Sequence, residues 1–175
     1  MAEQHRRIGR VSACIDDLGR IAASELADRE KRKQLRYRMR GMTGRTPRWI
    51  TPRAIELGGK SGCVDEHVVP LRILAQRLID GASPAEVMSV ADVMCRVTNA
   101  EDQRVSYVRT RWPDLEHELL ASQWSVIKVV NLGWERYRRA GLAPKWTGHL
   151  NDGRPLLASE PCPCGQGRSA LHCCR

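Results

Sequence analysis

An acidic residue stands directly before a histidine near the middle of the chain, within the sequence VDEHVVP at residues 64–70. Glu66 offers a carboxylate to a hard divalent metal ion, and His67 offers an imidazole that titrates near neutral pH. Together they form the pair that a metal-assisted hydrolase needs. The same residues also fit a surface glutamate beside a histidine that packs at a strand end, so this stretch alone leaves both interpretations open.

Four of the seven cysteines gather in the sequence PCPCGQGRSALHCCR at residues 161–175. Thiolates are soft ligands, and four of them in one short segment are typical of a structural Zn²⁺ site. The free energy of metal binding can fold a segment that is too short to build a core. A redox-active thiol cluster is the alternative. The expected zinc ligands are Cys162, Cys164, Cys173 and Cys174. We expect the other three cysteines, Cys14, Cys63 and Cys95, to be small buried hydrophobic residues.

The net charge of +9 comes from one part of the chain, because residues 31–60 contain ten basic residues and a single acid, Glu56. Such a block favours a phosphate backbone through counterion release and electrostatic steering. A solvated helix face is the alternative, and an anionic membrane surface or an acidic protein would also attract it. The expected nucleic-acid contacts are Lys31, Arg32, Lys33, Arg36, Arg38, Arg40, Arg45, Arg48, Arg53 and Lys60.

The length of 175 residues suits one domain, or one domain with a small appendage, and 42% hydrophobic residues can form a core. No apolar run approaches the roughly 20 residues that span a membrane, and the N-terminal residues are charged. We therefore expect a cytoplasmic protein without membrane insertion.

Apolar spacing and caps predict a mostly helical chain. Expected helices cover residues 3–40, with a break near Gly19, and residues 52–57, 70–79, 84–91, 100–108, 116–120 and 126–140. Residues 28–40 are charged and poor in apolar positions, which favours a projecting arm that becomes ordered on nucleic acid. Ser83 and Glu86 have the spacing of a capping box. Two short strands are expected at residues 63–69 and 93–98, and residues 41–52 are expected to form a loop.

The predicted fold class is α+β, mostly helical, with a small two-stranded ββα-type finger and a C-terminal zinc knuckle. The predicted divisions are a basic N-terminal helical arm at 1–60, a core at 61–142, a linker at 143–159 and a zinc motif at 160–175.

The cysteine-rich segment closely resembles the SEC-C motif, in which a C-x-C pair, a Gly-x-Gly turn and a final pair of ligands bind zinc. The resemblance implies that Gly165 and Gly167 form the turn between the two cysteine pairs. The motif is a small adaptor for protein or nucleic-acid contacts in many bacterial proteins. The resemblance therefore implies Zn²⁺, a protein partner for the tail, and a bacterial or phage origin.

The central region resembles the HNH, or ββα-metal, endonuclease finger, in which an acid–histidine pair on the first strand precedes a short apolar stretch and a proline. The resemblance implies that His67 is the general base and that Glu66, or Asp65, binds Mg²⁺ or Mn²⁺. The family has His or Asn on the following helix, where this chain has Asp102 or Gln103. Asp102 is a competent hard-metal ligand.

Two functions follow from these expectations. The first is a metal-dependent endonuclease acting on nucleic acid, with DNA as the expected substrate, in which His67, Glu66 and Asp102 form the catalytic site. The second is a non-catalytic adaptor with a degenerate finger, which binds nucleic acid or protein and contains zinc.

Overall fold

The structure is a computed structural model that describes residues 2–42, 47, 49–59, 61–106, 111–121 and 125–146, with side chains in the first helix from residue 12 onward. Helices dominate this part of the chain, and the short strands form one sheet. The expected α+β class with a mostly helical content is therefore confirmed. No helix in the described ranges is long and apolar enough to cross a membrane.

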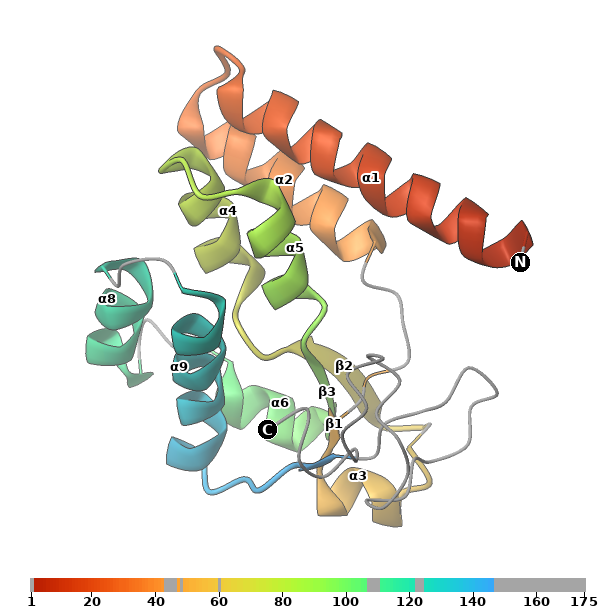
Figure 1. Cartoon of the computed structure of the whole chain (residues 1–175). Coiled ribbons are helices and arrows are strands. Elements are labelled where there is room, and N and C mark those ends of the chain that lie inside the picture. Colours follow the sequence, from red (N-terminus) through yellow and green to blue (C-terminus); the bar gives the residue numbers. More distant parts are fainter. Residues whose placement is uncertain are drawn as a thin grey trace.

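Four helices form one layer of the molecule: α1 (Ala2–Ala23), α2 (Asp28–Met42), α4 (Leu71–Ile79) and α5 (Pro84–Ala91). Figure 1 shows α1 and α2 side by side, packed over α4 and α5. The chain turns between α1 and α2 at residues 24–27, so the predicted helix break near Gly19 is wrong.

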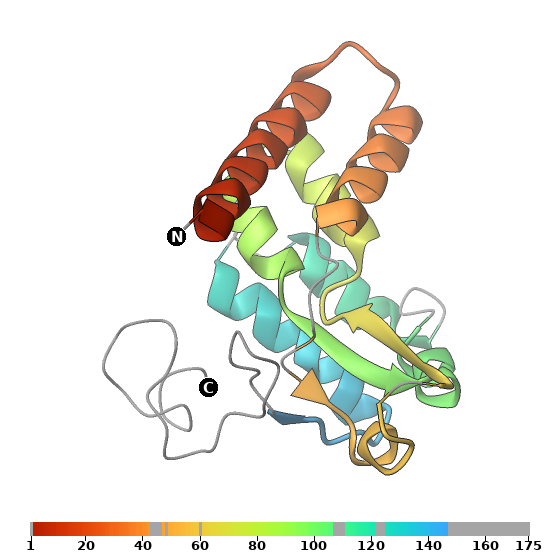
Figure 2. The same ribbon diagram turned by 90° about the vertical axis from the view of Figure 1, so that its right-hand side faces the viewer.

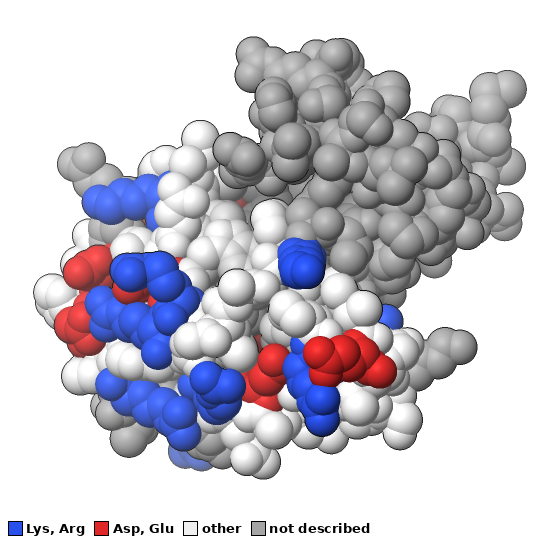
Figure 3. All heavy atoms as spheres, turned by 90° about the horizontal axis from the view of Figure 1, so that it is seen from below, with Lys and Arg blue, Asp and Glu red and all other residues white. Residues whose placement is uncertain are grey.

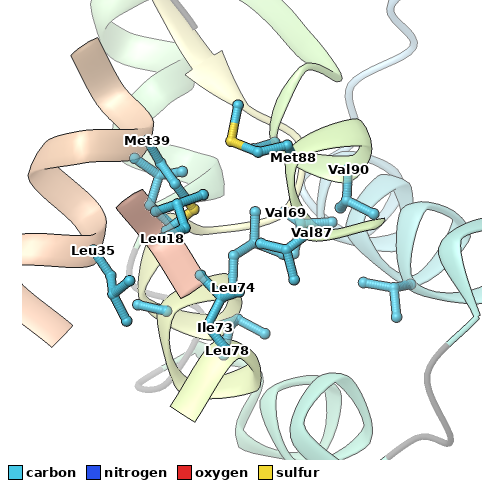
Figure 4. Packing of buried hydrophobic residues seen from close by; sticks show 14 of the residues in the cluster. Leu18, Leu35, Met39, Val69, Ile73, Leu74, Leu78, Val87, Met88 and Val90 are labelled. Carbon is cyan, nitrogen blue, oxygen red and sulfur yellow. The ribbon is translucent and has the colours of Figure 1, made fainter. Parts of the chain in front are cut away.

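The buried side chains of these helices meet in a common core (Figure 4). Leu18 from α1, Leu35 and Met39 from α2, and Leu74 from α4 all have no exposed surface. The described part of α2 is therefore a packed element of the core, and the prediction of a projecting arm is wrong. Its apolar residues are few, but they stand four positions apart and face α4.

The sheet contains β1 (Trp49–Ile50), β2 (Cys63–His67), β3 (Met94–Thr98) and β4 (Lys145–Trp146) in the order β2-β3-β1-β4. Strands β2 and β3 are antiparallel, β1 runs parallel to β3, and β4 is antiparallel to β1. The two longer strands lie where the sequence predicted them. The two short strands lie in the predicted loop at 41–52 and linker at 143–159, so the expected two-stranded finger is part of a larger sheet.

The remaining described helices are α3 (Pro52–Glu56), α6 (Asn99–Val105), α8 (Pro113–Ala121) and α9 (Val126–Arg139). Figure 2 shows α9 running behind the paired strands β2 and β3. Gly133 permits this approach, because a Cβ atom there would lie 2.8 Å from the backbone oxygen of Val68. Helix α9 therefore covers the end of β2 closely.

Two predicted helix starts differ in how they are capped. Ser83 is the N-cap of α5, but its side chain makes no capping hydrogen bond, so the predicted capping box with Glu86 does not form. Thr98 caps α6 in a complete capping box with Glu101. The second cap anchors the helix directly at the end of β3.

Candidate functional site

The ββα unit is formed by β2, β3 and α6. Five residue pairs join the two strands, from Cys63 with Thr98 to His67 with Met94. Helix α6 begins directly after β3 and contacts both strands. The buried Glu101 carboxylate accepts hydrogen bonds from Thr98 N at 2.9 Å and Thr51 Oγ1 at 2.7 Å. These bonds fix the start of α6 against the sheet, which determines where Asp102 lies.

Glu66 lies against a buried arginine of α9. Its Oε1 accepts a hydrogen bond from Arg136 Nη2 at 3.1 Å, and the side chains of the two residues are 24% and 1% exposed. Burial raises the pKa of Glu66, the Arg136 charge opposes this rise, and the Asp102 charge adds to it.

His67 is the last residue of β2 and is only 8% exposed. Its Nδ1 lies 2.9 Å from the carbonyl oxygen of Ala91. Since a carbonyl only accepts hydrogen bonds, Nδ1 carries the hydrogen, and the neutral ring has its lone pair on Nε2. Burial lowers the pKa of His67, and the charges of Arg40 and Arg136 lower it further, whereas the bond to Ala91 raises it.

Glu66 and His67 point to opposite faces of β2, as adjacent strand residues do. The Glu66 side chain meets Arg136 of α9, whereas the His67 ring meets the end of α5. Asp65, the alternative metal ligand, points away from Glu66 and is held by Arg96 through bonds of 2.7 and 2.9 Å. The structure thus pairs Glu66 with Arg136 and Asp65 with Arg96, and His67 lies on the face of β2 opposite to Glu66.

Asp102 lies in the first turn of α6 and is partly buried. Its Oδ1 accepts a hydrogen bond from Ser106 Oγ at 3.3 Å, whereas the neighbouring Gln103 is exposed. Two carboxylates suit Mg²⁺, which is often held by one or two carboxylates and completes its shell with water and substrate phosphate. Within the described ranges no group of three or more His, Cys, Asp or Glu residues is arranged to hold a metal ion. Of the two candidate metal ligands, Glu66 is engaged by Arg136, and Asp102 is the candidate on α6.

Arg136 is the site residue that sequence reasoning missed. Besides Glu66, its guanidinium donates to the carbonyl oxygens of His67 at 2.5 Å and Val105 at 3.4 Å. The apolar spacing of residues 126–140 marked Trp134 and Tyr137 as core positions. Arg136 adjoins Tyr137 in the sequence, but a basic residue late in a helix is ordinarily exposed, so no sequence signal distinguished it.

The predicted nucleic-acid contacts are distributed over several environments. Arg38 pairs with Asp17 of α1, Arg32 donates to Gln76 at 2.7 Å, and Arg53 pairs with Glu56. Side chains that remain exposed are Lys33, Arg36, Arg40 and Arg53, and Lys31 is partly buried. Arg45, Arg48 and Lys60 lie outside the described residues. Figure 1 shows most of α2 in the helical layer, away from α6.

A second set of basic residues lies at the ends of α6 and α9. Arg104 of α6 donates to the carbonyl oxygen of Ala140, and the last turn of α9 contains Arg138 and Arg139. Glu135 pairs with both of the latter arginines. Figure 3 shows the molecule from below, with Lys and Arg side chains gathered in groups and acidic side chains beside them. The pairing with Glu135 reduces the net positive charge at the end of α9.

A pocket of about 500 Å³ lies beside α9, between the sheet and the end of α5. Trp49, Trp134 and Tyr137 line it, and Asp92 and Arg138 provide charged groups. The ring centroids of Trp49 and Trp134 are 4.8 Å apart. An aromatic lining of this kind can stack a planar ring, and a nucleobase is one such ring.

The expected zinc ligands Cys162, Cys164, Cys173 and Cys174 lie outside the described residues. Of the other cysteines, Cys14 and Cys95 are fully buried and Cys63 is partly buried. The prediction of small buried hydrophobic residues is confirmed for the first two.

No protein-family model matches the chain, no curated protein matches it, and no solved structure matches it.

Proposed function

We propose that the protein is a metal-dependent endonuclease that hydrolyses phosphodiesters in nucleic acid, with DNA as the expected substrate. The observation that carries the proposal is the ββα unit, in which β2 supplies Glu66 and His67 and the first turn of α6 supplies Asp102. Because Nδ1 of His67 is committed to the carbonyl of Ala91, Nε2 is the basic nitrogen. We also propose that the protein acts in the cytoplasm.

The roles of the residues follow from their chemistry. His67 Nε2 accepts the proton of the attacking water, and the Ala91 carbonyl holds the ring in that tautomer. Glu66 and Asp102 would hold a Mg²⁺ or Mn²⁺ ion, which supplies Lewis-acid stabilisation of the charge on the phosphate oxygens. The aromatic pocket supports nucleic acid as the substrate, because unstacked bases bind to aromatic rings. The cysteine tail would hold a structural Zn²⁺ ion and contact a protein partner.

A second candidate is a non-catalytic adaptor with a degenerate finger, which binds nucleic acid or protein. The observation that favours it is the ion pair of Glu66 with Arg136, which engages one of the two carboxylates. The opposite directions of the Glu66 and His67 side chains on β2, and the slight exposure of His67, favour it as well. In this alternative the ββα unit is a scaffold, and the zinc tail carries the recognition.

Incubation of the full chain with supercoiled plasmid, in Mg²⁺, Mn²⁺ or EDTA, tests the proposal. We expect metal-dependent nicking, lost at least 100-fold in His67→Ala, because general-base catalysis contributes about 10² to 10⁴ in rate. His117→Ala is the matched control, since His117 is exposed on α8 and lies outside the ββα unit. Nicking should continue unchanged in that variant.

The opposite results are equally informative. Metal-dependent nicking that persists in His67→Ala would remove His67 from its role as the base. If no metal supports nicking while DNA is still retained in a salt-dependent way, the adaptor becomes the better description.

A further inference from the structure

Helix α2 carries a row of basic side chains on its outward face, and the proposed nuclease chemistry gives these residues no role. Five positions at helical spacings of three and four are exposed along it: Arg29, Lys33, Arg36, Tyr37 and Arg40. We call this row the α2 stripe. Another face of the same helix places Leu35 and Met39 in the core. The packing therefore fixes the direction in which the α2 stripe points, and Figure 2 shows α2 along one side of the helical layer.

Acids do little to neutralise the α2 stripe. The acids of α2 stand in its first turn, and residues 31–42 contain none. Lys33 Nζ lies 3.8 Å from Glu30 Oε2, which is an exposed and weak ion pair. Within the described part of the chain, neither Arg29 nor Arg36 takes part in an ion pair.

Arginines on other elements behave differently. Many of them are neutralised by an acid, including exposed ones on α1, α3 and α9. Arginines with an acid partner in the described ranges are Arg20, Arg38, Arg53, Arg72, Arg96, Arg136, Arg138 and Arg139. The excess charge of the α2 stripe therefore stands out from the rest of the fold, and it favours an anionic partner over a merely solvated helix face.

We propose that the α2 stripe is a docking surface for the phosphate backbone of duplex nucleic acid, separate from the ββα unit. Arg29 and Arg40 mark the two ends of the row, which rises by about 16 Å along the helix. One strand of B-DNA carries about five phosphates over such a rise. The inference goes beyond the proposed nuclease, since the surface would bind a duplex whether or not the ββα unit cleaves it.

Tyr37 adds a neutral hydrogen-bond donor to the row. It is 82% exposed, in the middle of the basic residues. A tyrosine hydroxyl donates to phosphate oxygens, as arginine and lysine side chains do. Contacts of this kind position a duplex without reading its bases. We therefore expect binding that depends strongly on salt and weakly on base sequence.

Other anionic partners fit the α2 stripe less well. A helix that lies on a membrane inserts an apolar face, but Leu35 and Met39 are already buried in the core. Protein interfaces have a centre with few charged residues, whereas the α2 stripe offers one aromatic side chain among four cations. Single strands are bound by stacking on successive aromatic rings, and a single tyrosine does not form such a platform.

Binding of the full chain to a fluorescently labelled DNA duplex, measured by anisotropy at several NaCl concentrations without Mg²⁺ or Mn²⁺, tests the proposal. The double variant Lys33→Gln with Arg36→Gln removes two charges from the α2 stripe. We expect the slope of log K against log salt to fall in magnitude by about 1.8, because each lost phosphate contact changes it by about 0.9. The affinity should fall about 10-fold at moderate salt, and equally for duplexes of unrelated sequence.

The double variant Lys128→Gln with Arg53→Gln is the matched control. It also replaces one lysine and one arginine by glutamine, and both residues are exposed. Lys128 lies on α9, and Arg53 lies on α3, where it is paired with Glu56. The net charge of the chain falls equally in the two double variants. The control should keep the slope of the unaltered chain, and an equal fall in both variants would overturn the docking surface in favour of an effect of overall charge.

Tyr37→Phe removes only a hydroxyl group. We expect duplex binding about threefold weaker with an unchanged salt slope, because a neutral contact releases no counterion. An unchanged affinity would contradict the contact assigned to Tyr37. Circular dichroism checks that these variants are folded, as expected for substitutions at exposed positions.

Two further measurements separate this surface from its alternatives. If the Lys33→Gln with Arg36→Gln variant keeps its affinity for the duplex but no longer sediments with vesicles that contain phosphatidylserine, the surface faces a membrane and the proposal fails. A smaller salt slope in that variant, with no plasmid nicking by the unaltered chain in any metal, would keep the docking surface and reject the endonuclease. Nicking by the unaltered chain together with an unchanged slope in the variant would do the reverse.

Discussion

Two cysteines that are buried at different ends of the core have thiols that resist ionisation. Burial is the main cause that raises the pKa of Cys95, and the charge of Glu101 raises it further. Burial likewise raises the pKa of Cys14. Only the thiolate reacts with alkylating reagents, so both residues should be inert in the folded protein.

Mass-spectrometric mapping after treatment with iodoacetamide checks this prediction. At pH 8 we expect labelling of the partly buried Cys63 and none of Cys14 or Cys95. A rise to pH 9 should leave Cys95 unlabelled, because its pKa lies above that range. Both buried residues should react once the chain is unfolded in denaturant. Rapid labelling of Cys95 in the native protein would show that the sheet region opens more readily than its packing implies.

At the scale of single residues, the local sequence indicates which residues are candidates for a site. It does not indicate which residues pair with one another in the fold. The pair Glu66–His67 is a candidate because of its neighbours in the sequence, and Asp102 is a candidate because it lies on the helix that follows the second strand. The pairing of Glu66 with Arg136 joins residues 70 positions apart, and no local pattern contains that information. Asp65 was an equal candidate for metal binding until the alternation of β2 directed it to Arg96.

Helix caps provide a matched comparison at the scale of elements. Thr98 Oγ1 accepts the hydrogen bond of Glu101 N in the capping box of α6, whereas the side chain of Ser83 makes no such bond at α5. We expect Thr98→Ala to lower the free energy of unfolding by about 1–2 kcal/mol, and Ser83→Ala by less than about 0.5 kcal/mol. Urea unfolding followed by circular dichroism measures both. Equal effects would mean that the cap at Ser83 forms in solution.

Two helical glycines test how closely α9 approaches the sheet. A Cβ atom at Gly133 would lie 2.7 Å from Val69 Cγ2 and 2.8 Å from the Val68 oxygen, whereas one at Gly41 of α2 meets nothing within 4 Å. Because a backbone oxygen cannot rotate away, Gly133→Ala should destabilise the protein by about 1–3 kcal/mol.

Gly41→Ala is the control, and it should be neutral or stabilise by up to about 1 kcal/mol through helix propensity. Thermal unfolding of the two variants gives the comparison. A neutral Gly133→Ala would show that α9 can move away from the sheet at little cost.

At the scale of the whole molecule, α1 and α2 share one buried core with α4 and α5, so we expect the four helices to unfold as one cooperative unit. Leu35 is fully buried among residues of these helices, whereas Tyr37, two positions further along α2, is 82% exposed. Leu35→Ala should cost about 2–5 kcal/mol and lower the midpoint of a single unfolding transition. Tyr37→Ala should change the free energy of unfolding by less than about 0.5 kcal/mol. An unchanged midpoint in Leu35→Ala would show that α2 is an arm that does not contribute to the stability of the core.

The fold class and most helices could be predicted because apolar spacing and caps are local signals. The packing of α2 in the core could not be predicted, because only Leu35 and Met39 form its buried stripe among many charged residues. Strand β1 was not predicted, because two residues between prolines are too few to show an alternation of apolar and polar side chains. Its pairing with β3 also depends on the folded chain. The same holds for β4, whose partner Ile50 stands 95 positions before Lys145 in the chain.

The order of the strands also constrains when the protein can finish folding during its synthesis. The antiparallel pair β2–β3 and its helix α6 can assemble as soon as residue 105 has left the ribosome. Strand β1 emerges before both, yet its outer edge stays unpaired until Lys145 and Trp146 arrive. During that interval the nascent chain presents an open sheet edge at Trp49 and Ile50, and an open edge can pair with a strand of another chain.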